Sequence, residues 1–186
     1  MKGFTLVELL VTISLTMILL GIGIYYSRSI KFANILEENI TFLASKIYQA
    51  RSLALSPKKI SGNNPCGFGI YLPPFPPFPK NEFYLFADLA ANCENSDHKW
   101  SSPAETIEKF TLSPSVEILW RHLVVSGVTS SVSEISILFT PPEPKVYFNG
   151  VEATSSSEAR MVVVEKVTGR AGVVGVNRMG GIEFIY

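Results

Sequence analysis

Residues that could carry out catalysis are few in this chain and stand in unrelated contexts. The two histidines, His98 and His122, lie in different segments, and only the neighbours Asp97 and His98 could form half of a catalytic pair. Such neighbours in a polar loop are usually solvated, whereas an activated nucleophile needs its base within hydrogen-bond reach. The two cysteines lack metal-ligand spacing, and neither a phosphate loop nor a nucleophile-elbow motif is present. We therefore expect no enzyme, no metal site and no cofactor.

Glu8 is the ionisable residue in the most unusual surroundings. It is the only charged residue in the apolar run over residues 4–26. A carboxylate inside a membrane helix costs about 3 kcal/mol or more, so a residue of this kind is a functional candidate by default. The alternative is an ordinary membrane anchor that happens to contain a glutamate.

The run that contains Glu8 is long enough to cross a membrane. Its length of about 23 residues matches a hydrocarbon core of about 30 Å when the run is helical. Lys2 precedes the run, and Arg28 and Lys31 follow it. A secretory signal would have a shorter apolar core followed by a small-residue cleavage site, and neither feature is present.

A helical period continues beyond the apolar run. Apolar residues recur there at spacings of three and four, which predicts one buried helix face. These residues are Phe32, Leu36, Ile40, Leu43, Ile47, Ala50 and Ala54. Since the first proline is Pro57, we expect one helix over residues 4–55, about 75–80 Å long.

The remaining sequence alternates with a period of two and predicts an antiparallel sheet or sandwich. Expected strands cover residues 67–72, 82–87, 106–112, 116–120, 123–125, 134–140, 145–148, 161–165, 173–176 and 182–186. The fold class is therefore α+β: a long N-terminal helix, transmembrane and then amphipathic, packed on a small antiparallel β-sheet or sandwich domain.

The segment over residues 73–79 contains five prolines and two phenylalanines and interrupts the strand pattern. Proline cannot donate ladder hydrogen bonds, so we expect a polyproline-II-like loop. One interpretation is a docking motif for an aromatic groove on another protein. The other, which we favour, is a stiff surface connection whose two phenylalanines fold back on the domain.

The N-terminal sequence Gly3-Phe4-Thr5-Leu6-Val7-Glu8 resembles the processing and methylation motif of type IV pilins and pseudopilins. In that family a membrane peptidase cleaves after the glycine and methylates the new N-terminal phenylalanine. The resemblance implies cleavage after Gly3, methylation of Phe4 and a role for Glu8 in assembly. It divides the chain into a leader (1–3), a transmembrane helix (4–26), an amphipathic extension (27–55) and a globular β domain (56–186).

The resemblance also implies a location and partners. The chain would be a single-pass protein of the bacterial inner membrane, with its β domain on the extracytoplasmic side. Its partners would be other pilin or pseudopilin subunits, the prepilin peptidase and N-methyltransferase, an inner-membrane assembly platform and membrane lipid. Since that side is oxidising, Cys66 and Cys93 are expected to form a disulfide, with two buried free thiols as the alternative.

Several segments of the β domain are similar to the H-type minor pseudopilins of type II secretion and to related minor pilins. They are residues 50–54, 66–68, 135–141 and 182–186. We therefore expect a minor subunit of a secretion or pilus filament. The alternatives are a DNA-binding competence pilin and a tethered binding domain that never polymerises. DNA binding is disfavoured because the net charge is zero and Glu183 stands where DNA-binding relatives carry basic residues, although Arg170 and Arg178 are nearby in sequence.

Overall fold

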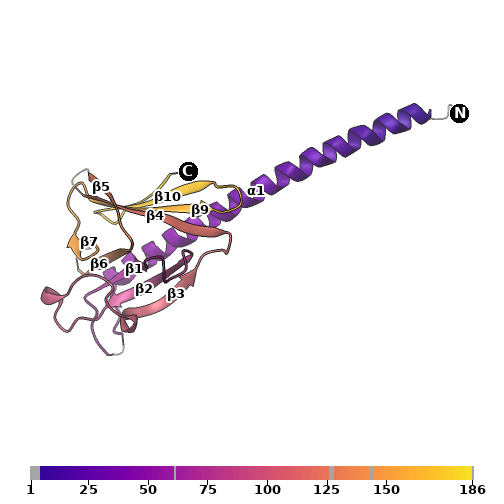
Figure 1. Ribbon diagram of the computed structural model, residues 1–186. Coiled ribbons are helices and arrows are strands. Elements are labelled where there is room, and N and C mark those ends of the chain that lie inside the picture. The colour runs from indigo at the N-terminus through magenta and orange to yellow at the C-terminus, as the bar shows by residue number, and fades with distance from the viewer. Residues whose placement is uncertain (1–4, 61, 126–127, 143–144, 186) are drawn as a thin grey trace.

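A single helix, α1 (Leu6–Leu55), organises the protein, and its first half projects from the β domain as a bare rod (Figure 1). The computed structural model describes residues 5–60, 62–125, 128–142 and 145–185, and for residues 25, 26, 28 and 29 it describes the backbone alone. The helix begins at a threonine cap, Thr5, and ends at Ser56, directly before the first proline of the chain. The expected helix is thus confirmed from Leu6, while Phe4 lies outside the described residues.

Two antiparallel sheets pack with the second half of α1. The six-stranded sheet has the order β3-β2-β1-β6-β7-β8. Its strands are β1 (Gly67–Leu72), β2 (Glu82–Asp88), β3 (Thr106–Thr111), β6 (Ile135–Thr140), β7 (Lys145–Phe148) and β8 (Val151–Glu152). The five-stranded sheet has the order β11-β10-β9-β4-β5. Its strands are β4 (Val116–Val125), β5 (Val128–Ser131), β9 (Glu158–Glu165), β10 (Ala171–Asn177) and β11 (Ile182–Ile185). Two short 3-10 helices, η1 (Cys93–Asn95) and η2 (Pro103–Glu105), lie between β2 and β3.

The buried face of α1 is the apolar stripe that the sequence predicted. Six of its seven residues are buried, and Phe32 at its start is half-buried. The stripe contacts β1 and β6 of one sheet and β9 and β10 of the other. Inward-facing side chains of both sheets complete this core, among them Phe68, Phe139 and Met161. The class is therefore α+β, as expected.

The predicted strands differ from the observed ones at three places. The segments 116–120 and 123–125 form one strand, β4, whose register shifts between Ile118 and Trp120 where it pairs with β9. This bulge breaks the alternation and made one strand read as two. Strands β5 and β8 were not expected, because β5 is exposed along its whole length and β8 has only two residues.

The proline-rich loop agrees with the favoured interpretation, a surface connection, for one of its two phenylalanines. Phe78 packs edge-on against Tyr84, with ring centroids 6.3 Å apart, so this phenylalanine folds back on the domain. Phe75 stays 53% exposed, and the ammonium of Lys80 lies 4.8 Å from its ring centre. One aromatic side chain of the loop is therefore open to solvent.

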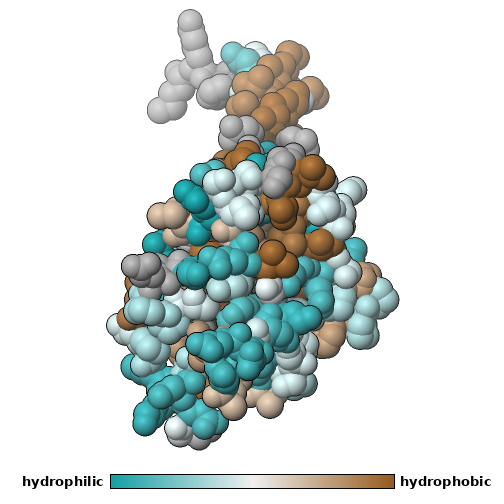
Figure 2. Space-filling view, turned by 90° about the vertical axis from the view of Figure 1, so that its left-hand side faces the viewer, coloured by the Kyte–Doolittle hydropathy of each residue, from teal (hydrophilic) through white to brown (hydrophobic). Residues whose placement is uncertain are grey.

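The two ends of the β domain differ in character. Figure 2 looks at the end opposite the projecting rod, where hydrophilic residues cover most of the lower surface. Hydrophobic residues gather along the helix that recedes behind it (Figure 2). On this face, hydrophobic residues therefore lie mainly along α1 and next to it.

Candidate functional site

The projecting half of α1 is apolar and has no partner among the described residues. Its segment Leu6–Ile24 has a mean hydropathy of 2.3 over 19 residues, and none of it is buried. The hydroxyls of Thr12, Ser14 and Thr16 donate hydrogen bonds to backbone carbonyls within the same helix. Backbone and hydroxyl groups are therefore satisfied internally, as a lipid environment requires. By length and composition this segment can cross a membrane.

Glu8 occupies the third position of α1 and forms a capping box with Thr5. Its Oε2 accepts hydrogen bonds from the Thr5 amide and the Thr5 hydroxyl, each at 3.0 Å. In return, Thr5 Oγ1 accepts the Glu8 amide at 3.3 Å. Thr5 was missed at the sequence level, although threonine followed three residues later by glutamate is the usual signature of this cap. Gly3 and Phe4, the expected processing residues, lie outside the described residues.

The N-terminal segment matches a known family model. The model of the prokaryotic N-terminal methylation motif matches residues 1–24, which include the Gly3-Phe4 bond, Glu8 and most of the apolar rod. The N-terminal segment of this chain is therefore a methylation motif of the kind that type IV pilins carry. No curated protein and no solved structure matches this chain significantly. This motif is typical of structural subunits.

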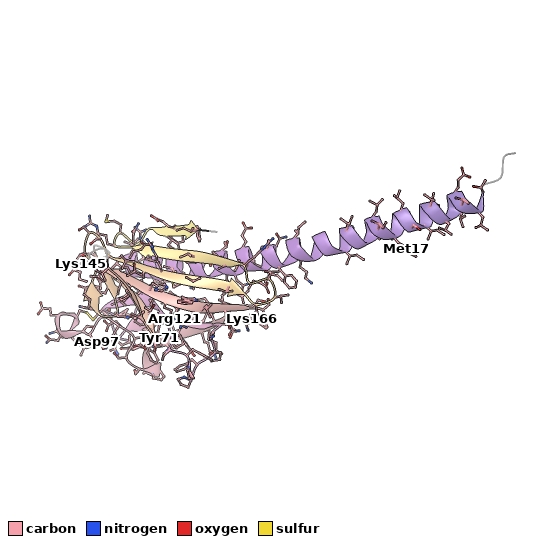
Figure 3. All side chains as sticks on the ribbon, turned by 45° about the horizontal axis from the view of Figure 1, so that its top comes forward. Met17, Tyr71, Asp97, Arg121, Lys145 and Lys166 are labelled. Carbon is pink, nitrogen blue, oxygen red and sulfur yellow. A yellow bond between two sulfur atoms is a disulfide. The ribbon has the colours of Figure 1, made fainter. Side chains whose placement is uncertain are left out.

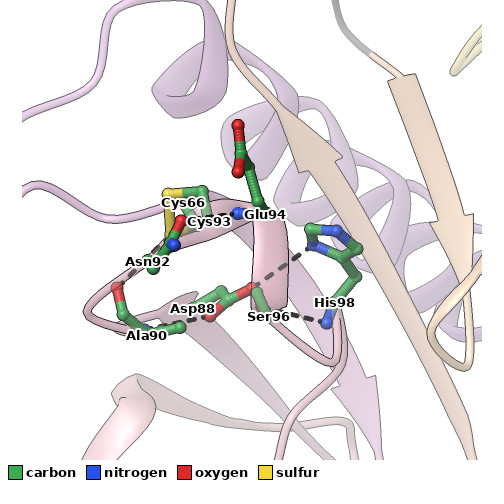
Figure 4. Close-up of a disulfide and its surroundings, with 8 residues drawn as sticks. All are labelled: Cys66, Asp88, Ala90, Asn92, Cys93, Glu94, Ser96 and His98. Carbon is green, nitrogen blue, oxygen red and sulfur yellow. Dashed lines mark hydrogen bonds and ion pairs between the residues drawn. A yellow bond between two sulfur atoms is a disulfide. The ribbon is translucent and has the colours of Figure 1, made fainter.

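Cys66 and Cys93 form a disulfide, with Cα atoms 5.2 Å apart (Figure 4). The bridge joins the residue before β1 to the first residue of η1, which confirms the expected pair and excludes the alternative of two free thiols. Closing a loop of 27 residues is worth about 3.5 kcal/mol in the chain-entropy model. It therefore holds the polar loop after β2 against the end of the six-stranded sheet.

The loop closed by the disulfide places His98 next to Asp88, and not next to the carboxylate of its sequence neighbour (Figure 4). His98 Nδ1 lies 3.7 Å from Oδ2 of Asp88, whose side chain is 1% exposed. The hydroxyl of Ser96 donates to that same oxygen, and the Ala90 amide donates to Oδ1. Asp97 instead accepts from Ser101 and from the Lys99 amide.

These contacts hold the loop after β2 in place and do not form a catalytic arrangement. The Ser96 hydroxyl points at a carboxylate and not at the imidazole, so serine, histidine and aspartate are not in the order that activates a nucleophile. The His98 ring packs against Tyr147, with centroids 4.2 Å apart, which fixes the loop on β7. Asp88 gives no signal in the sequence, because it is simply the last residue of a strand.

The two arginines that could have formed a DNA site are far apart in the structure. Arg170 directly precedes β10 and Arg178 directly follows it, so the strand's length of about 23 Å separates them. Glu183 pairs with Gly175 in the middle of that sheet edge. A hydrogen bond and the charge of Glu158 raise the pKa of Arg160, to which Glu183 adds a smaller effect. A clustered phosphate-binding surface is therefore not formed by these residues.

One buried cation lies inside the β domain. Arg121 on β4 is 6% exposed, and its Nε and Nη2 atoms have no hydrogen-bond partner among the described residues. Burial lowers its pKa, and the neighbouring Tyr71 acts in the opposite direction (Figure 3). The Tyr71 hydroxyl donates a hydrogen bond of 2.7 Å to Glu134. Burial has the largest effect in raising the pKa of Tyr71, and this hydrogen bond raises it further. Trp100 stacks on the Tyr71 ring at 4.2 Å.

Proposed function

We propose that this pilin-like chain is a minor pseudopilin or minor pilin, a structural subunit of an inner-membrane filament that serves protein secretion. The main observation in favour of this proposal is that α1 is continuous. The same uninterrupted helix carries the methylation motif, exposes an apolar rod and then forms the core of the β domain. Such a rod suits helix-to-helix packing in a filament, while the domain faces outward.

The more specific assignment is to the H-type minor pseudopilins of type II secretion. A long helix packed on two antiparallel sheets is the architecture that this resemblance implies. The disulfide supports an extracytoplasmic β domain, because such bridges persist in oxidising compartments. In this proposal the domain boundaries are residues 1–3, 4–26, 27–55 and 56–186.

Processing is the first step of this function. The peptidase would remove residues 1–3, and its methyltransferase activity would modify the amine of Phe4. Partners after processing are other pilin-like subunits, the assembly platform and the lipid that surrounds the rod. None of these roles requires chemistry by the chain itself.

Intact-mass analysis of the protein from its native membrane tests the proposal. The expected mass is that of residues 4–186 plus one methyl group, with the disulfide formed. A variant with Gly3→Val keeps the apolar rod and should retain the leader, which makes it the matched control. Retention of Met1, Lys2 and Gly3 in the wild-type protein contradicts the assignment.

A deletion strain separates the two filament types. Loss of this subunit should abolish export of secreted proteins if it serves type II secretion. It should reduce surface pili and leave protein export intact if it serves a type IV pilus. Complementation with the intact gene is the control.

A further inference from the structure

Strand β10 runs alongside α1, so contacts at its two ends show which end of the β domain lies nearer to the apolar rod. At its start, Arg170 and Ala171 line a depression together with Ala33 and Leu36 of α1. Beyond its end, the Gly180 carbonyl accepts a hydrogen bond of 3.2 Å from Arg51, eighteen residues further along the helix than Ala33. The turn between β9 and β10, residues 166–170, therefore lies at the end of the domain that faces the apolar rod, and Lys166 lies at that end in Figure 3.

The height of this turn above the apolar segment follows from element geometry. Ile24 ends the candidate span, and nine helical residues to Ala33 correspond to about 13–14 Å. The 166–170 turn reaches back past Ala171 by about two residues, or about 7 Å. The remaining height of about 7 Å is close to the thickness of one headgroup layer, about 5–7 Å.

The turn is held in one shape by a buried carboxylate. Glu165 is 0% exposed, and its carboxylate accepts the amides of Val167 and Thr168 at 2.9 and 2.7 Å. The Thr168 hydroxyl donates to it as well, at 2.7 Å. Gly169 has a φ of 69°, a conformation that favours glycine, and its amide returns to the Glu165 carbonyl. The turn therefore presents a fixed surface.

That surface is a hydrophobic side chain with basic neighbours. Val167 is 66% exposed at the tip, and the exposed residues Lys166 and Arg170 flank it. The Lys166 ammonium donates to the Pro114 carbonyl at 2.9 Å, which fixes its position beside the turn. On α1, Glu37 borders the depression behind the turn.

We propose that the 166–170 turn rests on the membrane and binds anionic phospholipid headgroups before the subunit enters a filament. The inference depends on the proposed function only in that α1 spans the bilayer. Lys166 and Arg170 face the phosphate layer, and Val167 enters its apolar boundary. Each basic residue near such a surface strengthens binding about fivefold. The contact sets the tilt of the whole subunit relative to the bilayer.

Paramagnetic relaxation of valine methyl groups tests this contact. The full chain, with methyl-labelled valine, is placed in nanodiscs that contain a lipid with a nitroxide headgroup. The bilayer is phosphatidylcholine, with or without phosphatidylglycerol. Val167 should broaden strongly when phosphatidylglycerol is present. Val128 and Val151 are equally exposed, at 69% and 66%, but lie in the half of the domain away from the rod and should stay sharp.

Charge variants complete the test. The pair Lys166→Gln and Arg170→Gln should lower the docking equilibrium about 25-fold, at about fivefold for each charge, and restore the Val167 signal. The control pair, Lys145→Gln and Arg178→Gln, changes the net charge equally and should leave the broadening intact. If Val167 stays sharp, or broadens equally without phosphatidylglycerol, the proposal is overturned while the filament function stands. A chain that fails to enter nanodiscs overturns both.

Discussion

The carboxylate of Glu8 is partly satisfied within its own helix, and this changes how its role in assembly is understood. Thr5 supplies two hydrogen bonds to Oε2, which reduces the cost of a charge at the edge of the apolar rod. The other oxygen is left for a donor outside the helix. In the proposed function this donor is the amine of Phe4 that processing would create, either in the same chain or in a neighbouring subunit. Such an ion pair forms only at one axial offset, so it would set the register between helices.

Glu8→Ala should therefore leave membrane insertion intact and impair incorporation into filaments, while Glu8→Asp should be intermediate because it is shorter. Crosslinking to partner pilins, with membrane fractionation in parallel, measures both effects. Thr5→Val is the matched control, because it removes the side-chain cap at a cost of about 1 kcal/mol but keeps the charge. Normal assembly of Glu8→Ala would show that the carboxylate is not an assembly determinant.

Arg121 is a second residue whose charge works against folding. Its guanidinium is buried, and two of its nitrogens have no hydrogen-bond partner among the described residues. Replacing even a buried charge that is paired, together with its partner, by apolar side chains of similar volume is often neutral or stabilising by about 1–4 kcal/mol. Arg121→Met should raise the thermal midpoint of the full chain in detergent, followed by near-ultraviolet circular dichroism.

The control for Arg121 is Arg160→Met on the outer face of the same sheet. Arg160 is more exposed and pairs with Glu158 at 2.7 Å, so its loss should change stability by less than about 1 kcal/mol. A destabilised Arg121→Met protein would mean that the guanidinium makes interactions that stabilise the β domain.

At the scale of elements, the β9–β10 hairpin depends on the charged form of Glu165. Burial acts to raise the pKa of Glu165, but the bonds from Val167 and Thr168 outweigh it and lower the pKa below its ordinary value. A carboxylate with a lowered pKa stabilises the fold above its unfolded-state pKa, about 4.3. This stability is lost as the pH falls through the lower, folded-state value.

Glu165→Gln should therefore lower the free energy of unfolding by about 2 kcal/mol at pH 7. The difference from wild type should shrink as the pH falls below about 4, because the wild-type carboxylate then becomes neutral too. Urea unfolding of both proteins in detergent at several pH values measures this. A difference that is constant with pH would contradict the role of the charge. Glu117→Gln, a surface carboxylate paired with Lys80, is the control and should have little effect.

The elements that were predictable from the sequence are those in which burial follows a simple period. The stripe from Leu36 to Ala54 repeats at helical spacing, and β1 and β6 are short apolar runs between turn residues. Strand β5, with the sequence Val-Thr-Ser-Ser, has no buried side and pairs with β4. Strand β5 forms because β4 pairs with it, and the sequence of β5 alone does not indicate this pairing.

The same distinction applies to the candidate site. The methylation motif is predictable because it is local in sequence, and the cap at Thr5 lies within the same few residues, whereas the roles of Gly3, Phe4 and Glu8 stay predictions. The pairing of His98 with Asp88 was not predictable, since it depends on how the disulfide folds the loop back across β2. A contact of this kind depends on the tertiary fold and cannot be predicted from neighbouring residues in the sequence.

At the scale of the whole molecule, much of the positive charge of the β domain is balanced by carboxylates close to it. The net charge is zero, and several cations of the β domain are paired with carboxylates. These pairs are Lys80–Glu117, Lys109–Glu82, Lys145–Glu152 and Arg160–Glu158. Arg170 and Arg178 stand at opposite ends of β10, with Glu183 on the neighbouring edge strand between them.

The full chain in detergent should therefore bind duplex DNA no better than a generic neutral protein. DNA affinity depends on clustered Lys and Arg that release counterions, and it falls steeply with salt when such a cluster exists. Fluorescence anisotropy of a labelled duplex, titrated with the protein at low and moderate salt, measures this. Glu183→Arg is an informative companion, because it removes the carboxylate beside Arg160 and adds a cation on the same edge. Salt-sensitive binding by the wild type at low micromolar concentration would favour a competence pilin, whereas binding that appears only in Glu183→Arg would identify this carboxylate as the residue that prevents it.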